Sequence, residues 1–180
     1  MKKSDAPAET NSRPTPQIVD VVIETPKGSR NKFKYDPNTR MFKLSKIFPQ
    51  GMMFPFDFGF VPSTKAEDGD PLDVLVLIEE STFPGCLLEC ALIGVIEAQQ
   101  REPNGKSNRN DRLIAAARQS LLYSEIADIR DLNAIVLRHV EAFFVNYQKL
   151  RDVEVAILAH HGAGHANDIL PTARIGKHAA

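Results

Sequence analysis

Up to about residue 117 the chain consists of short runs in which apolar and polar residues alternate, separated by Pro, Gly and Asn. Such alternation is typical of strands that bury one face. The predicted strands cover residues 18–25, 32–36, 41–44, 74–78, 87–98 and 113–116. The range 87–98 allows one long strand or two segments, and Pro37-Asn38 makes 32–36 and 41–44 a hairpin. The short connections predict a small antiparallel barrel.

The pattern changes to a helical period after Asp131, which is the predicted N-cap of a helix. Apolar residues three and four positions apart form one face of that helix: Leu132, Val136, Val140, Phe143, Phe144, Tyr147 and Leu150. Residues 153–158 predict a last strand. A weaker helix follows from Gly164, and Pro171 either breaks it or starts its final turn.

The predicted organisation is one domain preceded by a tail. Residues 1–15 are polar or small with nothing to bury, so they predict a disordered N-terminal tail. Residues 16–180 predict a single domain of α+β class, mainly β. Its expected architecture is a small closed antiparallel β-barrel, OB-like, flanked by one strong and one weak C-terminal helix.

The composition is that of an ordinary globular protein, with 43% apolar and 25% charged residues in 180. The net charge of −1 gives no global field for nucleic acid, and no apolar run approaches the roughly 20 residues that span a membrane. Lys2 and Lys3 precede polar residues, which argues against a signal peptide. Cys86 and Cys90 are best interpreted as reduced, buried thiols, so we expect a cytoplasmic protein.

The most informative segment is residues 68–73, in which Asp68, Asp70 and Asp73 precede an apolar run. Three carboxylates against a core strand are costly unless cations neutralise them. Their hard oxygen atoms suit Mg²⁺, which shares its other positions with water and phosphate. Asp, Gly and Pro are also ordinary turn residues, so a simple turn is the alternative. The spacing does not match an EF-hand loop.

Two other clusters have simpler explanations. The phenylalanines at period two, Phe54, Phe56, Phe58 and Phe60, predict core rather than a base-stacking surface, because basic residues do not alternate with them. The histidines at 160, 161 and 165 could bind Zn²⁺ or Ni²⁺, but we expect a solvated terminal segment.

Four segments together resemble family I soluble inorganic pyrophosphatases. They are residues 24–33, 54–62, 68–73 and 143–147, and the likeness extends over about residues 16–165. It implies hydrolysis of pyrophosphate to two phosphates by a metal-activated water. Several Mg²⁺ ions per site are expected, with Mn²⁺ or Zn²⁺ as substitutes. The resemblance also implies a homo-oligomer, which is often a hexamer in relatives of bacterial size. We expect neither a nucleic acid nor a membrane as a partner.

The resemblance implies a role for each matching residue. Asp68, Asp70 and Asp73 match the metal carboxylates, Asp70 being the general base toward the attacking water. Glu24 matches an active-site carboxylate near the metals. The residues that match binders of substrate phosphate are Lys32, Lys46, Arg112 and Tyr147.

Several positions depart from the family pattern. Lys34 stands where many relatives carry Glu, Lys46 replaces an Arg, and Phe58 replaces an active-site Tyr. Gln148 stands where a Lys is common. Two further family Asp positions align with Gln100 and Asn110, neutral amides that bind Mg²⁺ without neutralising its charge; a shift by one residue would make Asp111 a ligand instead.

These departures leave a second hypothesis open. The chain could be a catalytically silent relative that binds phosphate or a nucleotide. A third reading, a barrel that binds nucleic acid, is disfavoured by the net charge and the acidic loop.

Overall fold

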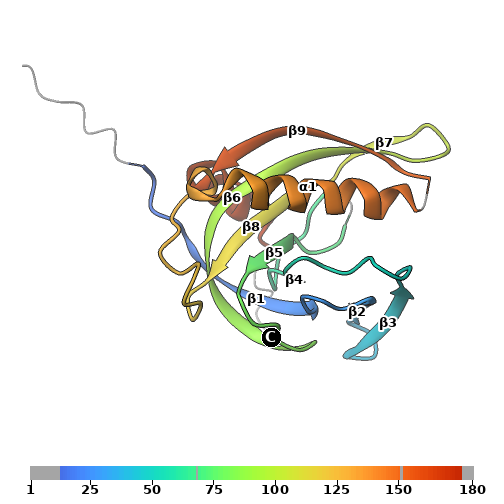
Figure 1. The fold of residues 1–180 in the computed structure, drawn as a ribbon, viewed down its shortest axis with the longest axis horizontal. Coiled ribbons are helices and arrows are strands. Elements are labelled where there is room, and N and C mark those ends of the chain that lie inside the picture. Colours follow the sequence, from blue (N-terminus) through green and yellow to red (C-terminus); the bar gives the residue numbers. More distant parts are fainter. Residues whose placement is uncertain (1–12, 68, 151, 176–180) are drawn as a thin grey trace, which may run out of the picture.

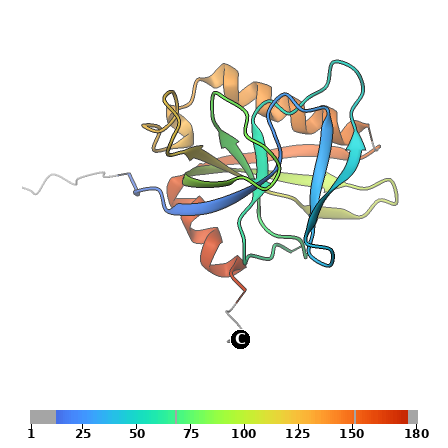
Figure 2. The ribbon, with the colours of Figure 1, turned by 90° about the horizontal axis from the view of Figure 1, so that it is seen from below.

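A ring of five hydrogen-bonded strands frames the molecule (Figures 1 and 2). The computed structural model describes residues 13–67, 69–150 and 152–175. In order around the ring, the strands are β1 (Ile18–Thr25), β4 (Asp57–Phe60), β5 (Asp73–Leu77), β8 (Arg112–Ala117) and β6 (Leu87–Arg101), which pairs again with β1. Mainly β structure with two helices confirms the predicted α+β class.

One pairing in the ring corrects the antiparallel prediction, because β5 and β8 run parallel. Residues 78–111 lie between these strands and include β6, which is antiparallel to β8 and returns the chain in the required direction. Hydrophobic alternation shows which face of a strand is buried. It carries no information on the direction of the neighbouring strand, which is why the sequence missed this pair.

Strand β6 is one continuous strand of 15 residues, which resolves the choice between one strand and two segments. It also pairs with β7 (Ser107–Arg109) and β9 (Glu154–Gly162). Its pairing with β8 shifts register between Leu92 and Gly94. A Cβ on Gly94 would lie 2.6 Å from the carbonyl oxygen of His161, so this close approach requires glycine.

The predicted hairpin is confirmed as β2 (Asn31–Asp36) and β3 (Met41–Ile47), a separate two-stranded sheet. It stands at the opposite end of the molecule from helix α2 (Ala163–Ala173) in both views (Figures 1 and 2). Helix α2 packs on β6 and includes Pro171 in its last turn. The strong helix, α1 (Ala134–Lys149), packs on β9.

Strand β5 is buried on both faces and separates two cores. Val74 and Val76 belong to one core, which includes Leu170 of α2, whereas Leu75 and Leu77 belong to the other. Successive side chains of a strand point to opposite faces, so an unbroken apolar run suits this central position. The second core is rich in aromatic residues from α1, from the segment before β4 and from β4 itself: Phe48, Phe54, Phe56, Phe58, Phe144 and Tyr147.

The start of α1 differs from the prediction. The side chain of Asn133, and not that of Asp131, accepts the N-cap hydrogen bond from the backbone of Ile135, at 2.8 Å. Asp131 belongs to a short 3₁₀ helix, η1 (Ile129–Asp131), and pairs with Arg13. Asp131 and Asn133 are both good capping residues, but Asp131 is the last residue of the 3₁₀ helix η1, so Asn133 is left to cap α1.

The predicted N-terminal tail falls partly outside the described residues. Residues 1–12 are not described. Of the rest, Arg13 pairs with Asp131, and the carbonyl of Thr15 accepts a hydrogen bond from Asn167.

Both cysteines are free thiols, Cys90 being buried and Cys86 partly buried. Burial raises the pKa of Cys90 to about 12. Within the described ranges, the helices are too short or too polar to cross a membrane.

The cap assignment predicts unequal effects of two neighbouring substitutions. Asn133→Ala should lower the free energy of unfolding by about 1 kcal/mol, because the Ile135 amide loses its acceptor. Asp131→Ala should cost less than about 0.5 kcal/mol, because its ion pair with Arg13 is exposed. Urea denaturation of both variants measures the difference, and a larger loss in Asp131→Ala would contradict this cap.

Candidate active site

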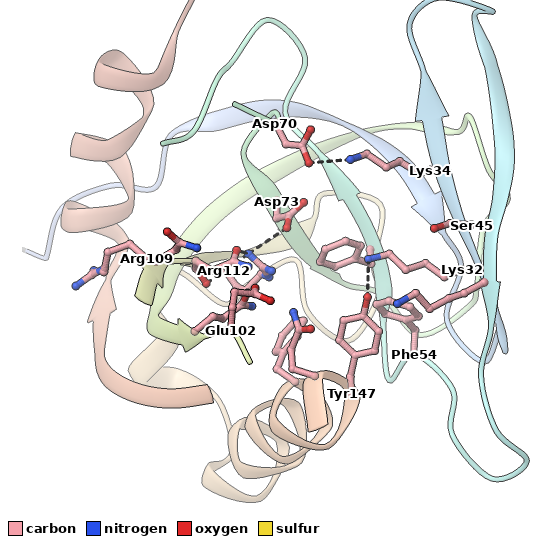
Figure 3. Close-up of a pocket in the computed structure, with 17 residues that line it drawn as sticks. Lys32, Lys34, Ser45, Phe54, Asp70, Asp73, Glu102, Arg109, Arg112 and Tyr147 are labelled. Atoms are coloured by element: carbon pink, nitrogen blue, oxygen red, sulfur yellow. Dashed lines mark hydrogen bonds and ion pairs between the residues drawn. The ribbon is translucent and has the colours of Figure 1, made fainter. Parts of the chain in front are cut away.

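An open pocket of about 440 Å³ lies between the hairpin β2–β3, the loop before β5, the β6–β8 region and helix α1 (Figure 3). Polar and charged residues dominate its lining, with three phenylalanines among them. The described lining residues are Lys32, Lys34, Ser45, Lys46, Phe54, Phe58, Asp70, Asp73, Gln100, Glu102, Asn108, Arg109, Asn110, Arg112, Phe144, Tyr147 and Gln148.

Two lysines and a tyrosine form one side of the pocket. Lys32 of β2 and Lys46 of β3 are opposite each other in the hairpin register. The Nζ atom of Lys32 lies 3.1 Å from the Tyr147 hydroxyl, and both ammonium groups lie 5.1 Å from the centre of its ring. Burial acts to raise the pKa of Tyr147, but the charges and hydrogen bonds of Lys32 and Lys46 outweigh it and lower that pKa.

A tight turn presents Asp70 to the pocket. The Asp70 carbonyl accepts a hydrogen bond from the backbone N–H of Ala66 at 2.7 Å, and that of Ala66 accepts from Gly69 at 3.0 Å. Gly69 has φ +90°, a left-handed conformation that other residues rarely adopt. The chain then enters β5, whose first residue is Asp73. Local backbone geometry therefore sets both carboxylates at one edge of the ring.

Both carboxylates are paired with cations (Figure 3). Asp70 accepts from Lys34 at 2.7 Å, and Asp73 pairs with Arg112 at 3.0 Å. The hydrogen bond to Asp70 is the main cause of a raised pKa of Lys34. The Asp73–Arg112 pair is the less exposed of the two, because Arg112 is buried at the start of β8. The acidic segment thus faces basic groups across the pocket.

The two candidate amide ligands, Gln100 and Asn110, also line the pocket. The side-chain oxygen of Asn110 accepts a hydrogen bond from Arg112. Asp111 instead lines an adjoining pocket, and its Oδ1 atom accepts from the backbone N–H of Ala98 at 3.1 Å and from Arg109 Nε at 3.2 Å. The sequence left open whether Asn110 or Asp111 occupies the second family Asp position. Of the two, Asn110 is the one that lines this pocket.

Glu24 lies behind the pocket at the end of β1, outside the set of described residues that line it. Its carboxylate is buried and accepts a hydrogen bond from the backbone of Tyr35 at 2.6 Å. Burial is the main cause of a raised pKa of Glu24, and the nearby charge of Asp73 adds to it. The Tyr35 hydrogen bond and the charges of two lysines oppose that rise.

The structure therefore brings most of the predicted site together. Eight predicted residues line one pocket: Lys32, Lys46, Asp70, Asp73, Gln100, Asn110, Arg112 and Tyr147. Glu24 and Asp111 are close by without lining it, and Asp68 lies outside the described residues.

Sequence reasoning missed Ser45, Glu102, Asn108 and Arg109, which also line the pocket. One signal was available for Asn108. It is paired with Gln100 across the β6–β7 hairpin, so placing Gln100 in a site would imply its cross-strand neighbour.

The charges of the lining indicate what the pocket can bind. Among the described lining residues, five are Lys or Arg and three are Asp or Glu, so the pocket favours a small polyanion. The Asp70 and Asp73 carboxylates and the amide oxygens of Gln100 and Asn110 are hard donors that suit a divalent cation. The fold and pocket thus define a protein that can hold a small phosphate-like anion together with a hard metal ion.

Comparisons with known proteins agree with that chemistry. The family model described as inorganic pyrophosphatase matches residues 21–174. Inorganic pyrophosphatases of Methanosarcina acetivorans and Nostoc sp. are each 32% identical, over 88% and 82% of this chain and 91% and 84% of theirs. The chain belongs to the inorganic pyrophosphatase family, and this membership implies a divalent metal cofactor.

Solved structures of the family share the fold. Inorganic pyrophosphatase from Thermus thermophilus superimposes with a TM-score of 0.80 at 31% identity, covering 92% of this chain and 97% of that one. An inorganic phosphatase from Anaplasma phagocytophilum gives a TM-score of 0.79 at 28% identity, covering 92% and 95%.

The lysine cluster predicts an unusually acidic phenol. Tyr147 should ionise below the ordinary value of 10.0, because Lys32 and Lys46 stabilise its phenolate. Lys32→Met removes one of these charges and should raise the pKa. The ultraviolet titration of each protein, after subtraction of its Tyr147→Phe counterpart, isolates this group. A midpoint that does not rise in Lys32→Met would contradict the assigned cause.

Proposed function

We propose that this protein hydrolyses inorganic pyrophosphate to two phosphates and requires Mg²⁺. One observation carries the proposal. In a chain of this family, the Asp70 and Asp73 carboxylates and the cations Lys32, Lys46 and Arg112 line a single pocket. A pocket with carboxylates on one side and cations on the other suits a substrate that is itself a polyanion and arrives with metal ions.

The oxygen donors of the pocket fit the proposed metal. Asp70 and Asp73 would supply charged ligands, with Gln100 and Asn110 as neutral ones. Asp68, outside the described residues, is proposed as a further ligand. When bound, Mg²⁺ would lower the pKa of a coordinated water and neutralise part of the charge of the diphosphate. Mn²⁺ and Zn²⁺ are proposed as substitutes.

The basic side of the pocket is proposed to hold the phosphates. Lys32 and Lys46 would bind one phosphate, and Tyr147, anchored by its 3.1 Å contact with Lys32, would donate its hydroxyl to it. Arg112 can bind the other phosphate once it leaves Asp73. In this arrangement the groups would lie where negative charge grows as the P–O bond breaks, so they would stabilise the transition state more than the ground state.

Two carboxylates have separate proposed roles. Asp70, at the pocket surface, would accept the proton of the attacking water as general base. Glu24 is buried and bonded to the backbone of Tyr35, so it would act from behind the site. Its negative charge lies near Asp73 and two lysines and would help to balance the charges of the loaded pocket.

A silent relative that binds the anion without turnover is the second candidate. The ion pairs Lys34–Asp70 and Arg112–Asp73 favour it, because metal ions must compete with cations already on both carboxylates. The neutral amides of Gln100 and Asn110 add no charge for the metals. Calorimetry separates the candidates, since heat of pyrophosphate binding without phosphate release would identify the silent protein.

The remaining expectations concern the context of the enzyme. We propose a homo-oligomer, a hexamer by resemblance, and a cytoplasmic location. We also interpret the ring of strands as the OB-like barrel expected from the sequence. Light scattering of the purified chain measures the oligomer size, and a monomeric mass at assay concentrations would reject the assembly.

The base assignment predicts a large loss of activity in one variant. Asp70→Asn keeps the size of the side chain and removes the proton acceptor, so phosphate release from Mg²⁺-pyrophosphate should fall at least about 100-fold. Asp20→Asn is the matched control, because Asp20 lies exposed on β1, away from the pocket. Equal phosphate release by Asp70→Asn and wild type would reject the proposed role.

The Lys34–Asp70 pair predicts that substitution of Lys34 lowers the Mg²⁺ concentration that activity requires. Lys34→Glu removes the competing cation and adds a carboxylate, so half-maximal activity should need about 3- to 10-fold less Mg²⁺. Lys34→Met should show a smaller decrease, because it only removes the positive charge. Activity measured against Mg²⁺ concentration tests both. An unchanged or higher Mg²⁺ requirement in Lys34→Glu would contradict this reading of the pair.

A further inference from the structure

A second group of candidate metal ligands lies outside the pocket. Glu97 is on β6, His161 is near the end of β9, and His165 is in the first turn of α2. The Nε2 atoms of His165 and His161 lie 3.2 Å and 3.6 Å from the same carboxylate oxygen of Glu97. One donor atom from each residue falls within 4.8 Å of the others.

We propose that Glu97, His161 and His165 form a binding site for a transition-metal ion such as Zn²⁺ or Co²⁺. Donors at 2.0–2.1 Å from a tetrahedral ion lie about 3.4 Å from one another, close to the two distances observed. Two imidazoles and one carboxylate leave a fourth position for water. The nitrogen donors select against Mg²⁺, so this site differs in chemistry from the oxygen-lined pocket.

The backbone around these ligands is held in place by close contacts. A Cβ on Gly162 would lie 2.2 Å from a carboxylate oxygen of Asp128, so the turn between His161 and α2 fits only glycine. The same Asp128 oxygen accepts the backbone N–H of Ala163 at 3.2 Å. Because this corner is fixed from β9 into α2, the backbone positions that carry the two imidazoles are set before an ion arrives.

The ligands also have an outer partner and a route to solvent. Arg109 donates at 3.1 Å to the same Glu97 oxygen that both imidazoles approach, and this contact holds the carboxylate in place beside them. The side chains of His161 and His165 are 41% and 45% exposed, so an ion can enter from water. Arg109 also binds Asp111, so Glu97 and Asp111 share one cation and the cluster retains negative charge for a metal.

The neighbouring histidine provides an internal control. Successive residues of a strand point to opposite faces, and His160 accordingly pairs with Glu141 of α1 and not with Glu97. His160→Ala removes an imidazole from the same strand and leaves the three proposed ligands intact. Without a metal, the two other imidazoles would simply donate hydrogen bonds to Glu97, and this is the rival explanation of the cluster.

Titration of the full-length protein with Co²⁺ tests the site, with excess Mg²⁺ present to occupy the oxygen-lined pocket. Wild type and His160→Ala should bind Co²⁺ with visible absorption bands of a nitrogen-coordinated ion. The double variant His161→Ala/His165→Ala should lose these bands and bind Co²⁺ at least about 100-fold more weakly. Asp70→Asn should keep the bands, because its carboxylate belongs to the other pocket.

Circular dichroism shows whether each variant folds. If the double variant does not fold, Glu97→Gln serves in its place, since it retains a polar side chain of the same size and should also weaken the bands. The proposal is overturned if wild type shows no imidazole-type bands. It is equally overturned if a folded variant lacking these ligands binds Co²⁺ with the affinity and bands of wild type. The two imidazoles would then only donate hydrogen bonds to Glu97.

Discussion

Asp70 and Asp73 sit at the edge of the strand ring with Lys34 and Arg112 directly against them, and this pairing of charge constrains the rest of the site. Carboxylates beside a core strand are tolerated only with cations nearby. Here the protein supplies these cations from other elements. In the proposed reaction, loading the pocket with metal and diphosphate would therefore mean an exchange of partners, in which metal ions take the carboxylates and basic groups turn to the anion.

The strands and helix around the pocket fix the positions of the charged groups that take part in this exchange. Strand β5 is buried on both faces, so its first residue, Asp73, emerges at a fixed point of the ring. Tyr147 comes from α1 and Lys32 from the separate hairpin, and they meet over an aromatic core that includes Phe58. The apolar floor excludes water beneath the charges and strengthens interactions between them.

Much of this arrangement could be predicted from the sequence because it depends on local patterns. Alternation located most of the strands and the β2–β3 hairpin, although β4 and β7 were not among the predicted strands. The helical period located α1, and the acidic segment located the pocket. The order of motifs then led to the family. The direction of β8 beside β5 was out of reach, since alternation is the same for parallel and antiparallel neighbours. The helix cap was missed because Asp131 and Asn133 are equally good capping residues.

Within the site, sequence reasoning identified residues better than it identified their partners. Nothing in the chain order indicated that Lys34 would contact Asp70, or that Asp111 would turn to Arg109 and the backbone of Ala98. His161 and His165 were interpreted as part of a solvated segment because their carboxylate partner, Glu97, is more than sixty positions away on β6. Such contacts follow from the three-dimensional arrangement of the strands and loops, and spacing along the chain does not reveal them.

Anomalous diffraction from crystals grown with Mn²⁺ and a non-hydrolysable diphosphate analogue would test the exchange of partners most directly. An exchange of partners predicts Mn²⁺ between Asp70 and Asp73, with Lys34 and Arg112 moved away from these carboxylates and Lys32 and Tyr147 on the analogue. Bound analogue with both ion pairs intact and Mn²⁺ absent from the two carboxylates would contradict it.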